Sequence, residues 1–322
     1  MVEGFKKLSR FRLQFSIFLV MVAIWILFLI GSPRTFLSFP IYASFMSTIP
    51  FAAIMALALT LVIISAEIDL SFPSIMGFAG WVFTIIFTTT GNIYLAFFAC
   101  LVTGIIAGFL NGVIVVKLGI PSLVATIGTM FFWRGLVMVC TGGWGKSLIP
   151  ARDTALYSIL VGRIGGRVPA QIIWTIIVAV ILWLFLNRHR FGAHVYLIGD
   201  NVESARMMGV GVDVVKMIVF SVLGFCAAFA GVIASLEVSY YWPSLGEGYL
   251  LRVMSAVFLG GTSVFGGTGT IFGTFIGALI IGCLEAGIVA MGLTGFWTQL
   301  IYGVIIVISV AIHSQVRKRS PI

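Results

Sequence analysis

The sequence has very few charged residues: 9% of its 322 residues are Asp, Glu, Lys or Arg, and only 10 are acidic. A soluble domain carries about a quarter charged residues, so this chain has too little polar surface to cover a water-soluble globule. Apolar residues make up 61% of the sequence, and the mean hydropathy is +1.18. The composition therefore predicts a protein that contacts membrane lipid. The net charge of +9 is explained by retention of basic residues on the cytoplasmic side, so no nucleic acid is expected as a partner.

Cysteine and histidine are also scarce. The four cysteines stand singly, and no pair has the spacing of metal ligands or of a disulfide framework. The three histidines flank the cytoplasmic ends of expected helices. Gly145-Lys146-Ser147 resembles the end of a P-loop, but Cys140 stands where its first glycine is required. The sequence thus predicts no catalytic residue, metal or cofactor, which argues against a membrane enzyme and against ATP hydrolysis by this chain.

Long apolar runs dominate the rest of the sequence. About 20 apolar residues in a helix cross the hydrocarbon core of a bilayer. Some of the runs are short or interrupted by Gly and Pro, so one or two are open to a re-entrant interpretation. The fold class that we expect is an all-α integral membrane protein with about ten transmembrane helices, at residues 13–31, 44–64, 74–90, 93–116, 121–141, 170–186, 214–236, 249–265, 271–290 and 296–313.

The distribution of Lys and Arg predicts the orientation of these helices. With the N-terminus inside, 12 basic residues fall in the cytoplasm and five outside, so both termini are expected in the cytoplasm. The first 12 residues then form a cytoplasmic segment, and the apolar run behind them lacks a cleavage signal and is interpreted as an uncleaved helix. Two longer loops follow, an extracytoplasmic one at 142–169 and a cytoplasmic one at 187–213. All other connections are short, so residues 1–322 are expected to form a single domain.

Glycines recur at intervals of four residues in two places. This spacing puts them on one helix face, where the backbone of another helix can approach closely. We expect these faces to pack within the fold, and the alternative is a contact between two copies of the chain. The residues are Gly104, Gly108 and Gly112 in the fourth expected helix, and Gly269, Gly273 and Gly277 at the start of the ninth.

A polar stretch, residues 65–73, interrupts apolar sequence between the second and third expected helices. Its two carboxylates, at i and i+2, do not face one way on a helix, and Pro73 disfavours helix at the residue before it. A charge near the bilayer centre costs about 2.5–3.5 kcal/mol, so a retained one usually lines a path or is paired. The stretch is either a broken helix that lines a path or a cytoplasmic turn.

The candidate residues of such a path are Glu67, Asp69, Ser71, Asn111, Thr126, Thr129 and the ring of Trp133. The alternative for the two threonines is a hydrogen bond to their own helix backbone.

The cytoplasmic loop contains a short helix with clear boundaries. Asn201 is expected as its N-cap, Glu203 lies near the positive end of the helix, Arg206 near the negative end, and Gly209 at the C-cap. Small and flexible apolar side chains suit insertion into a groove on a moving partner, and this segment carries Ala205, Met207 and Met208. The segment is predicted to couple the chain to an ATPase through Asp200, Asn201, Glu203, Ser204, Ala205, Arg206 and Gly209. The alternative is a connector without a partner.

Five short segments, in order along residues 45–313, carry a resemblance. They are Ile68–Ser71; Asn111-Gly112 with Pro121–Thr129 and Arg134-Gly135; Arg190–Gly192 with Ile198–Asn201; Leu259–Ser263 with Phe265–Gly269; and Phe296-Trp297 with Gln299 and Gly303. They resemble, in register, elements of the permeases of ribose/galactose-type ABC importers, such as GGIDLSVGS and GGTSLFGGRGS. These permeases are the sugar branch of a family that also holds branched-chain amino acid permeases.

The resemblance implies a permease in the bacterial inner membrane that imports a small hydrophilic solute, with a monosaccharide as the first expectation. It implies a second permease subunit, identical or different, cytoplasmic ABC ATPase subunits, and a periplasmic or lipid-anchored solute-binding protein. Departures from the family pattern at Ala66-Glu67, Asp200 and Leu251-Arg252 leave a polyol or a nucleoside open as the solute. The rival function is a proton- or sodium-coupled secondary transporter in which Glu67, Asp69 or Glu285 binds the ion.

Overall fold

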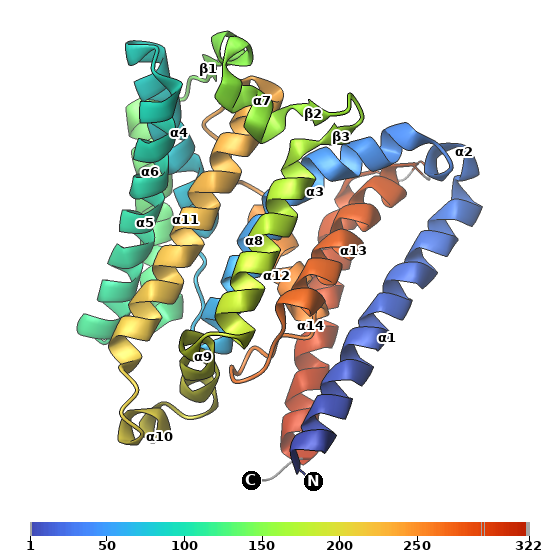
Figure 1. Ribbon diagram of the computed structural model, residues 1–322, viewed down its shortest axis with the longest axis vertical. Helices are drawn as coiled ribbons and strands as arrows, with labels where there is room; N and C mark the ends of the chain where they lie inside the picture. Colours follow the sequence, from blue (N-terminus) through green and yellow to red (C-terminus); the bar gives the residue numbers. More distant parts are fainter. Residues whose placement is uncertain (1, 291, 293, 320–322) are drawn as a thin grey trace.

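The chain is a bundle of roughly parallel and antiparallel helices (Figure 1). The computed structural model describes residues 2–319 apart from residues 291 and 293. Its long helices are α1 (Val2–Gly31), α3 (Phe39–Ile64), α4 (Phe72–Thr90), α5 (Ile93–Lys117), α6 (Ser122–Thr141), α8 (Ala170–Asn187), α11 (Val212–Val238), α13 (Ile271–Ala290) and α14 (Phe296–Arg319). Its short helices are α2 (Pro33–Phe36), α7 (Ala155–Val161), α9 (Arg190–Asp200), α10 (Val202–Met207) and α12 (Tyr249–Leu259), with a 3-10 helix, η1, at Ile149–Asp153.

Among the described residues, seven helices are long and apolar enough to cross a membrane: α3, α4, α5, α6, α8, α11 and α13. Shorter apolar helical stretches cover Ile17–Gly31, Tyr249–Leu259 and Phe296–Ala311, within α1, α12 and α14. The all-helical membrane fold that the sequence predicts is therefore confirmed. The expected number of about ten transmembrane helices is not established by this finding and stays a prediction.

Among the expected transmembrane helices, the eighth, at residues 249–265, differs most in length from the helix that the structure contains. Its helix, α12, has 11 residues and is about 17 Å long, about half of what the hydrocarbon core requires. It ends where Gly260 and Gly261 follow, the latter with φ +83°. The loop before it is deep in the bundle, because a Cβ at Gly246 would overlap the carbonyl of Pro73 in the first turn of α4. The segment therefore enters the bundle as a loop and leaves it as a half-length helix.

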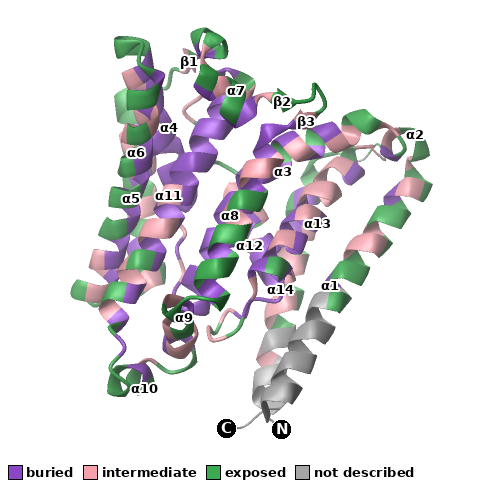
Figure 2. Ribbon diagram, in the orientation of Figure 1, coloured by how far each residue is buried: buried purple, intermediate pink, exposed green. Residues whose placement is uncertain are grey.

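The core is centred on α3. In its most apolar 18-residue window, 94% of residues are buried, against 22% in α6 and 28% in α8. Figure 2 shows this difference, with buried residues along α3 and α11 and exposed ones on α5, α6 and α8. An apolar sequence alone does not place α3 in the centre, because α5 and α8 are about as apolar and are much less buried. Lipid tails are as apolar as these side chains, so the contacts of α3 with the surrounding helices decide its position.

Helix contacts explain the first set of glycines. A Cβ at Gly104 or Gly108 would overlap the backbone of α11 at Gly224 or Phe220, so each lies directly against that helix. Gly112 faces Met217 of the same helix. Contacts within one chain already cover this glycine face. This favours packing of the two helices within the fold over a contact between two copies of the chain.

Contrary to the prediction from the sequence, the second set of glycines does not lie on a single helix face. Gly273 and Gly277 face the backbone of α12 at Gly260 and Ala256, which allows α12 and α13 to lie close together. Gly269, in contrast, precedes the first residue of α13 and lies against Thr262. The three glycines do not share one helix face, because the chain turns sharply before Ile271.

The bundle has two distinct ends (Figure 1). At one end, called the β1 end here, β1 (Lys146–Ser147) pairs with β4 (Tyr240–Tyr241), and β2 (Arg163–Ile164) pairs with β3 (Val168–Pro169). The predicted loop 142–169 thus contains η1, α7 and short strands. At the other end, the α10 end, α9 and α10 lie in the predicted loop 187–213, and α9 was not expected from the sequence. The first turns of α1 and the last turns of α14 lie at the α10 end as well.

Candidate coupling and translocation sites

The short helix α10 has the boundaries that its sequence predicts. The side-chain oxygen of Asn201 accepts a hydrogen bond from the backbone N–H of Ser204 at 2.9 Å, as an N-cap does. Glu203 lies in the first turn and Arg206 in the last, and Gly209 follows with φ +79°. Asp200 is the last residue of α9, so Asn201 is the single residue between the two helices.

The structure corrects the role expected of Ala205. Its side chain is fully buried against the rest of the chain, so it cannot insert into a groove on a partner. The exposed apolar side chains are those of Met207 and Met208, at 86% and 59%. Sequence alone could not separate the inner and outer faces of a six-residue helix, because that depends on where the neighbouring helices lie.

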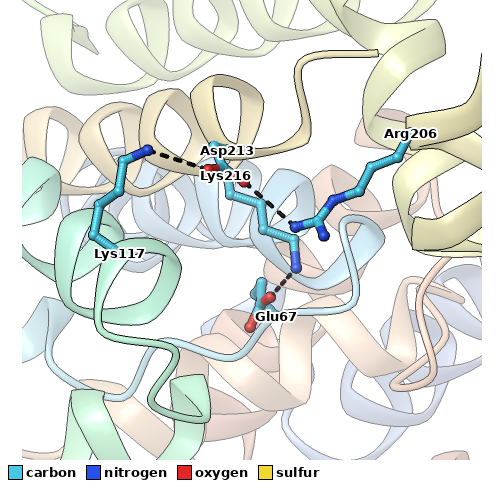
Figure 3. Close-up of polar contacts among 5 residues, drawn as sticks. All are labelled: Glu67, Lys117, Arg206, Asp213 and Lys216. Carbon is cyan, nitrogen blue, oxygen red and sulfur yellow. Dashed lines mark hydrogen bonds and ion pairs between the residues drawn. The ribbon is translucent and has the colours of Figure 1, made fainter. Parts of the chain in front are cut away.

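A chain of charged residues connects α10 to the bundle (Figure 3). Arg206 lies 3.5 Å from Asp213 in the first turn of α11, and Asp213 lies 3.2 Å from Lys117 at the end of α5. One turn further along α11, Lys216 forms an ion pair with Glu67 in the segment between α3 and α4. Five charged residues from four parts of the chain thus meet at the α10 end.

The two halves of this charge cluster differ in strength. The side chains of Arg206 and Lys117 are 61% and 58% exposed, and ion pairs exposed to this extent contribute about 0–1 kcal/mol. Glu67 and Lys216 are only 10% and 14% exposed, so each depends on the other for compensation of its charge. Both line a cavity of about 290 Å³ together with Ser122, Arg206 and Asp213. Arg206 of α10 and the Glu67–Lys216 pair therefore border the same cavity.

Asp69 belongs to a second, separate group. Its carboxylate accepts hydrogen bonds from the backbone N–H and the hydroxyl of Ser71, both at 2.7 Å, and from the side-chain amide of Asn111 at 3.2 Å. The same amide donates to the hydroxyl of Ser71 at 2.6 Å. Burial raises the pKa of the Asp69 carboxyl above its ordinary value, and the bonds from Ser71 and Asn111 act against this rise. The group fixes the non-helical segment 65–71 against α5.

The remaining candidates for a path lie on α6. Thr126 is fully buried and donates to the backbone carbonyl of Ser122 at 2.7 Å, as a threonine bonded to its own helix does. Thr129 donates to the carbonyl of Thr126 at 3.4 Å. The ring of Trp133 lies 5.1 Å from that of Phe78 in α4, centroid to centroid.

The structure brings some of the candidates for a path together and separates others. Asp69, Ser71 and Asn111 form one bonded group, Thr126 lies beside it through the carbonyl of Ile68 at 3.4 Å, and Glu67 faces the charge cluster instead. Because the polar atoms of the Asp69 group mostly bond one another, a role in solute passage stays a prediction. Asp213 and Lys216 were not expected from the sequence as partners in the charge cluster. Their positions in the first turns of a long apolar helix were the available signal.

Comparisons with known proteins agree with this architecture. The family model described as branched-chain amino acid transport system / permease component matches residues 41–310. The ribose import permease protein RbsC of Escherichia coli strain K12 is 35% identical over 265 residues, which is 82% of this chain and 82% of that protein.

A second relative is the autoinducer 2 import system permease protein LsrC of Yersinia pseudotuberculosis strain YPIII. It is 30% identical over 273 residues, which is 85% of this chain and 77% of that protein. No solved structure matches the chain. The family match, the two relatives and the seven apolar helices therefore show that the chain belongs to the permease component family of branched-chain amino acid transport systems and, as predicted, is a protein of the bacterial inner membrane.

Proposed function

We propose that the chain is the pore-forming permease subunit of an ABC importer and that it carries a small, hydroxyl-rich solute of the sugar class. The two relatives described above are permeases of import systems, for ribose and for autoinducer 2, and they support this class of solute. Under this proposal the chain pairs with a second permease subunit and works with cytoplasmic ATPases and a solute-binding protein. Polyols and nucleosides carry similar hydroxyl groups and are alternative solutes.

The α10 end is assigned to the cytoplasm. Arg188, Arg190, Arg206, Lys117 and Lys216 lie in or beside the helices at this end, and basic residues are retained on the cytoplasmic side of membrane proteins. The segment 142–169 then faces the outside, where a solute-binding protein would dock. Under this assignment the first turns of α1 and the last turns of α14 would lie on the cytoplasmic side, as expected from the sequence.

The observation that carries the proposed mechanism is the exposure of Met207 and Met208 at the end of α10, a helix whose Ala205 is buried against the rest of the chain. An ATPase that binds these flexible apolar side chains could move α10, because methionine adapts its shape to a partner surface. The ion pairs from Arg206 to Asp213 and from Lys216 to Glu67 would carry this movement to the segment between α3 and α4. Opening and closing of the solute route would follow at that segment.

The outward faces of α5 and α6 suit membrane lipid or the second permease subunit. Side chains such as Phe98, Val102, Phe109, Phe131 and Val139 are at least 45% exposed there. Apolar side chains at such positions would be costly in water and are suited to hydrocarbon.

A proton- or sodium-coupled transporter is the rival function. Such a transporter needs a carboxylate that can take up the ion. In the described structure Glu67 is paired with Lys216, Glu285 with Arg252, and Asp69 is hydrogen-bonded to Ser71 and Asn111. These pairings, together with the family of the chain, favour the ABC importer.

Reconstitution in proteoliposomes tests the proposal. The permease would be combined with a candidate ABC ATPase and a candidate solute-binding protein of the same organism, and uptake of D-ribose, ribitol and adenosine would be measured separately. We expect accumulation of one of these probes that requires ATP, the ATPase and the permease together. Accumulation driven by a proton or sodium gradient, without the ATPase, would establish the rival function instead.

A further inference from the structure

Two cavities meet at Thr48 in α3. The first, of about 420 Å³, is lined by residues that include Ser44, Ser47, Thr48, Arg163 and Glu237. The second, of about 30 Å³, is lined by Thr48 together with Arg252 of α12 and Glu285 of α13. Because Thr48 borders both, polar groups continue from the β1 end, where Arg163 lies in β2, into the bundle.

These residues lie well inside the helices that carry them. Thr48 is nine residues from the start of α3, about 14 Å along its axis, and Glu285 is 14 residues from the start of α13, about 21 Å along it. Arg252 reaches this depth because α12 is a half-length helix that begins inside the bundle. The three side chains therefore lie at membrane depth, between the β1 end and the middle of the bundle.

The charged pair at this depth is open on one side. The guanidinium of Arg252 lies 2.5 Å from the carboxylate of Glu285 and 5.2 Å from the centre of the Tyr249 ring. The side chains of Arg252 and Glu285 are 24% and 38% exposed, and Thr48 is exposed as well. Within the described residues, the buried Nε–H of Arg252 has no hydrogen-bond partner.

Exposed charges at this depth cannot face lipid without a large cost, so they border water, a solute or another polar surface. The cavity toward the β1 end gives water and solute a way to reach them. Their chemistry suits a hydroxylated solute, because a guanidinium donates to hydroxyl oxygens and a carboxylate accepts from hydroxyl hydrogens. Since Glu285 neutralises Arg252, the site favours an uncharged solute over an anion.

We propose that the outer half of the solute route runs along this face of α3, past Ser44 and Thr48, and that Arg252 and Glu285 form a solute-recognition site within it. This proposal rests on the proposed import function and adds to it the residues that determine specificity. It also moves the outer part of the route away from the Asp69 group, whose polar atoms mostly bond one another.

Thiol labelling tests whether the route contains water, and it requires neither the solute nor the ATPase. Thr48→Cys and the control Val102→Cys would each be exposed in intact cells to an impermeant cationic methanethiosulfonate reagent, with the wild-type chain as the baseline. Val102 is a matched control, because it is exposed and lies nine residues from the start of α5, as Thr48 does in α3. We expect Thr48→Cys to react at least about tenfold faster, since a charged reagent is excluded from hydrocarbon. Equal or slower labelling of Thr48→Cys would overturn the proposed route, and it would leave the import function itself untouched.

A charge swap tests recognition by the pair. Arg252→Glu alone places two carboxylates together and is expected to lower import of the probe found in reconstitution by at least about tenfold. The double variant Arg252→Glu, Glu285→Arg restores an ion pair, so we expect normal assembly and ATPase activity. If the pair recognises the solute, the KM of import in the double variant stays raised by about tenfold, equivalent to about 1.4 kcal/mol. A wild-type KM in the double variant would show that the pair only holds α12 and α13 together, and it would overturn the recognition site.

Discussion

At the scale of single residues, the two acidic side chains of the segment 65–71 have different environments although they are two positions apart. Asp69 is held by neutral donors in the interior, and Glu67 is held by the ammonium group of Lys216. The difference arises because non-helical backbone directs the two side chains toward different helices, Asp69 toward α5 and Glu67 toward α11. The environments of Asp69 and Glu67 therefore lead to separate predictions.

For Asp69, we expect Asp69→Ala to lower the free energy of unfolding by about 1–3 kcal/mol, because the buried donors of Ser71 and Asn111 lose their acceptor. Asp69→Asn keeps one oxygen for both bonds from Ser71 and is expected to assemble and to import solute nearly normally. Thermal unfolding in detergent and uptake in proteoliposomes measure the two effects. Loss of import by Asp69→Asn with normal assembly would instead assign the carboxylate charge to the solute route.

For Glu67, the partner is a largely covered charge whose side chain is 14% exposed, so the loss of one member matters more than the loss of both. Lys216→Met should destabilise the chain by about 3 kcal/mol, because Glu67 is left unpaired in an environment that excludes most water. Addition of Glu67→Gln should recover most of this loss. A double-mutant cycle on the unfolding free energy measures the coupling. Additive effects of the two changes would show that the ion pair does not form.

At the scale of elements, α10 has too few residues to be stable alone and depends on its caps and on its contacts with the bundle. Its buried face, at Ala205, holds it to the bundle, and its exposed face, at Met207 and Met208, is free for a partner. The double change Met207→Glu, Met208→Glu should therefore leave the fold intact and prevent co-purification with the ATPase. Ala205→Glu should lower the yield of folded protein, because it places a charge in the interior.

Arg206→Glu provides a graded test of the same helix. The change replaces the cation that faces Asp213 with a second acidic group, so the ion pair becomes a repulsion. It should weaken the attachment of α10 mainly at low salt, where exposed charges are least screened. ATPase binding measured at two ionic strengths distinguishes this effect. If all of these variants bind the ATPase like the wild type, α10 is a connector without a role in coupling.

At the scale of the whole molecule, the orientation in the membrane assigns a function to each end of the bundle. Ser158 in α7 and Ser204 in α10 are both exposed and lie at opposite ends. In intact cells, Ser158→Cys should react with an impermeant thiol reagent, and Ser204→Cys should react only after the membrane is permeabilised. The wild-type chain corrects for its exposed native cysteine, Cys140. Labelling of Ser204→Cys from outside would reverse the orientation and remove the cytoplasmic assignment of α10.

The amino-acid sequence by itself determined the class of the protein, the places of its long helices and the boundaries of α10. Long apolar runs and helix caps are local signals, so they require no knowledge of the rest of the chain. The expected span 170–186, for example, differs by one residue from α8. The motifs in family order were local too, and the family that they resemble is the one that the comparisons show.

Only the tertiary structure decided which side chains meet. The pairs Lys216 with Glu67 and Arg252 with Glu285 join residues 149 and 33 positions apart, and no periodicity in the sequence specifies such pairs. The burial of Ala205, the position of Gly269 outside its helix and the half length of α12 likewise depend on neighbouring helices. The physical reason is that the length of an apolar run fixes which segments become membrane helices. The packing of those helices fixes which face of each one is covered and which polar groups lie within reach of one another.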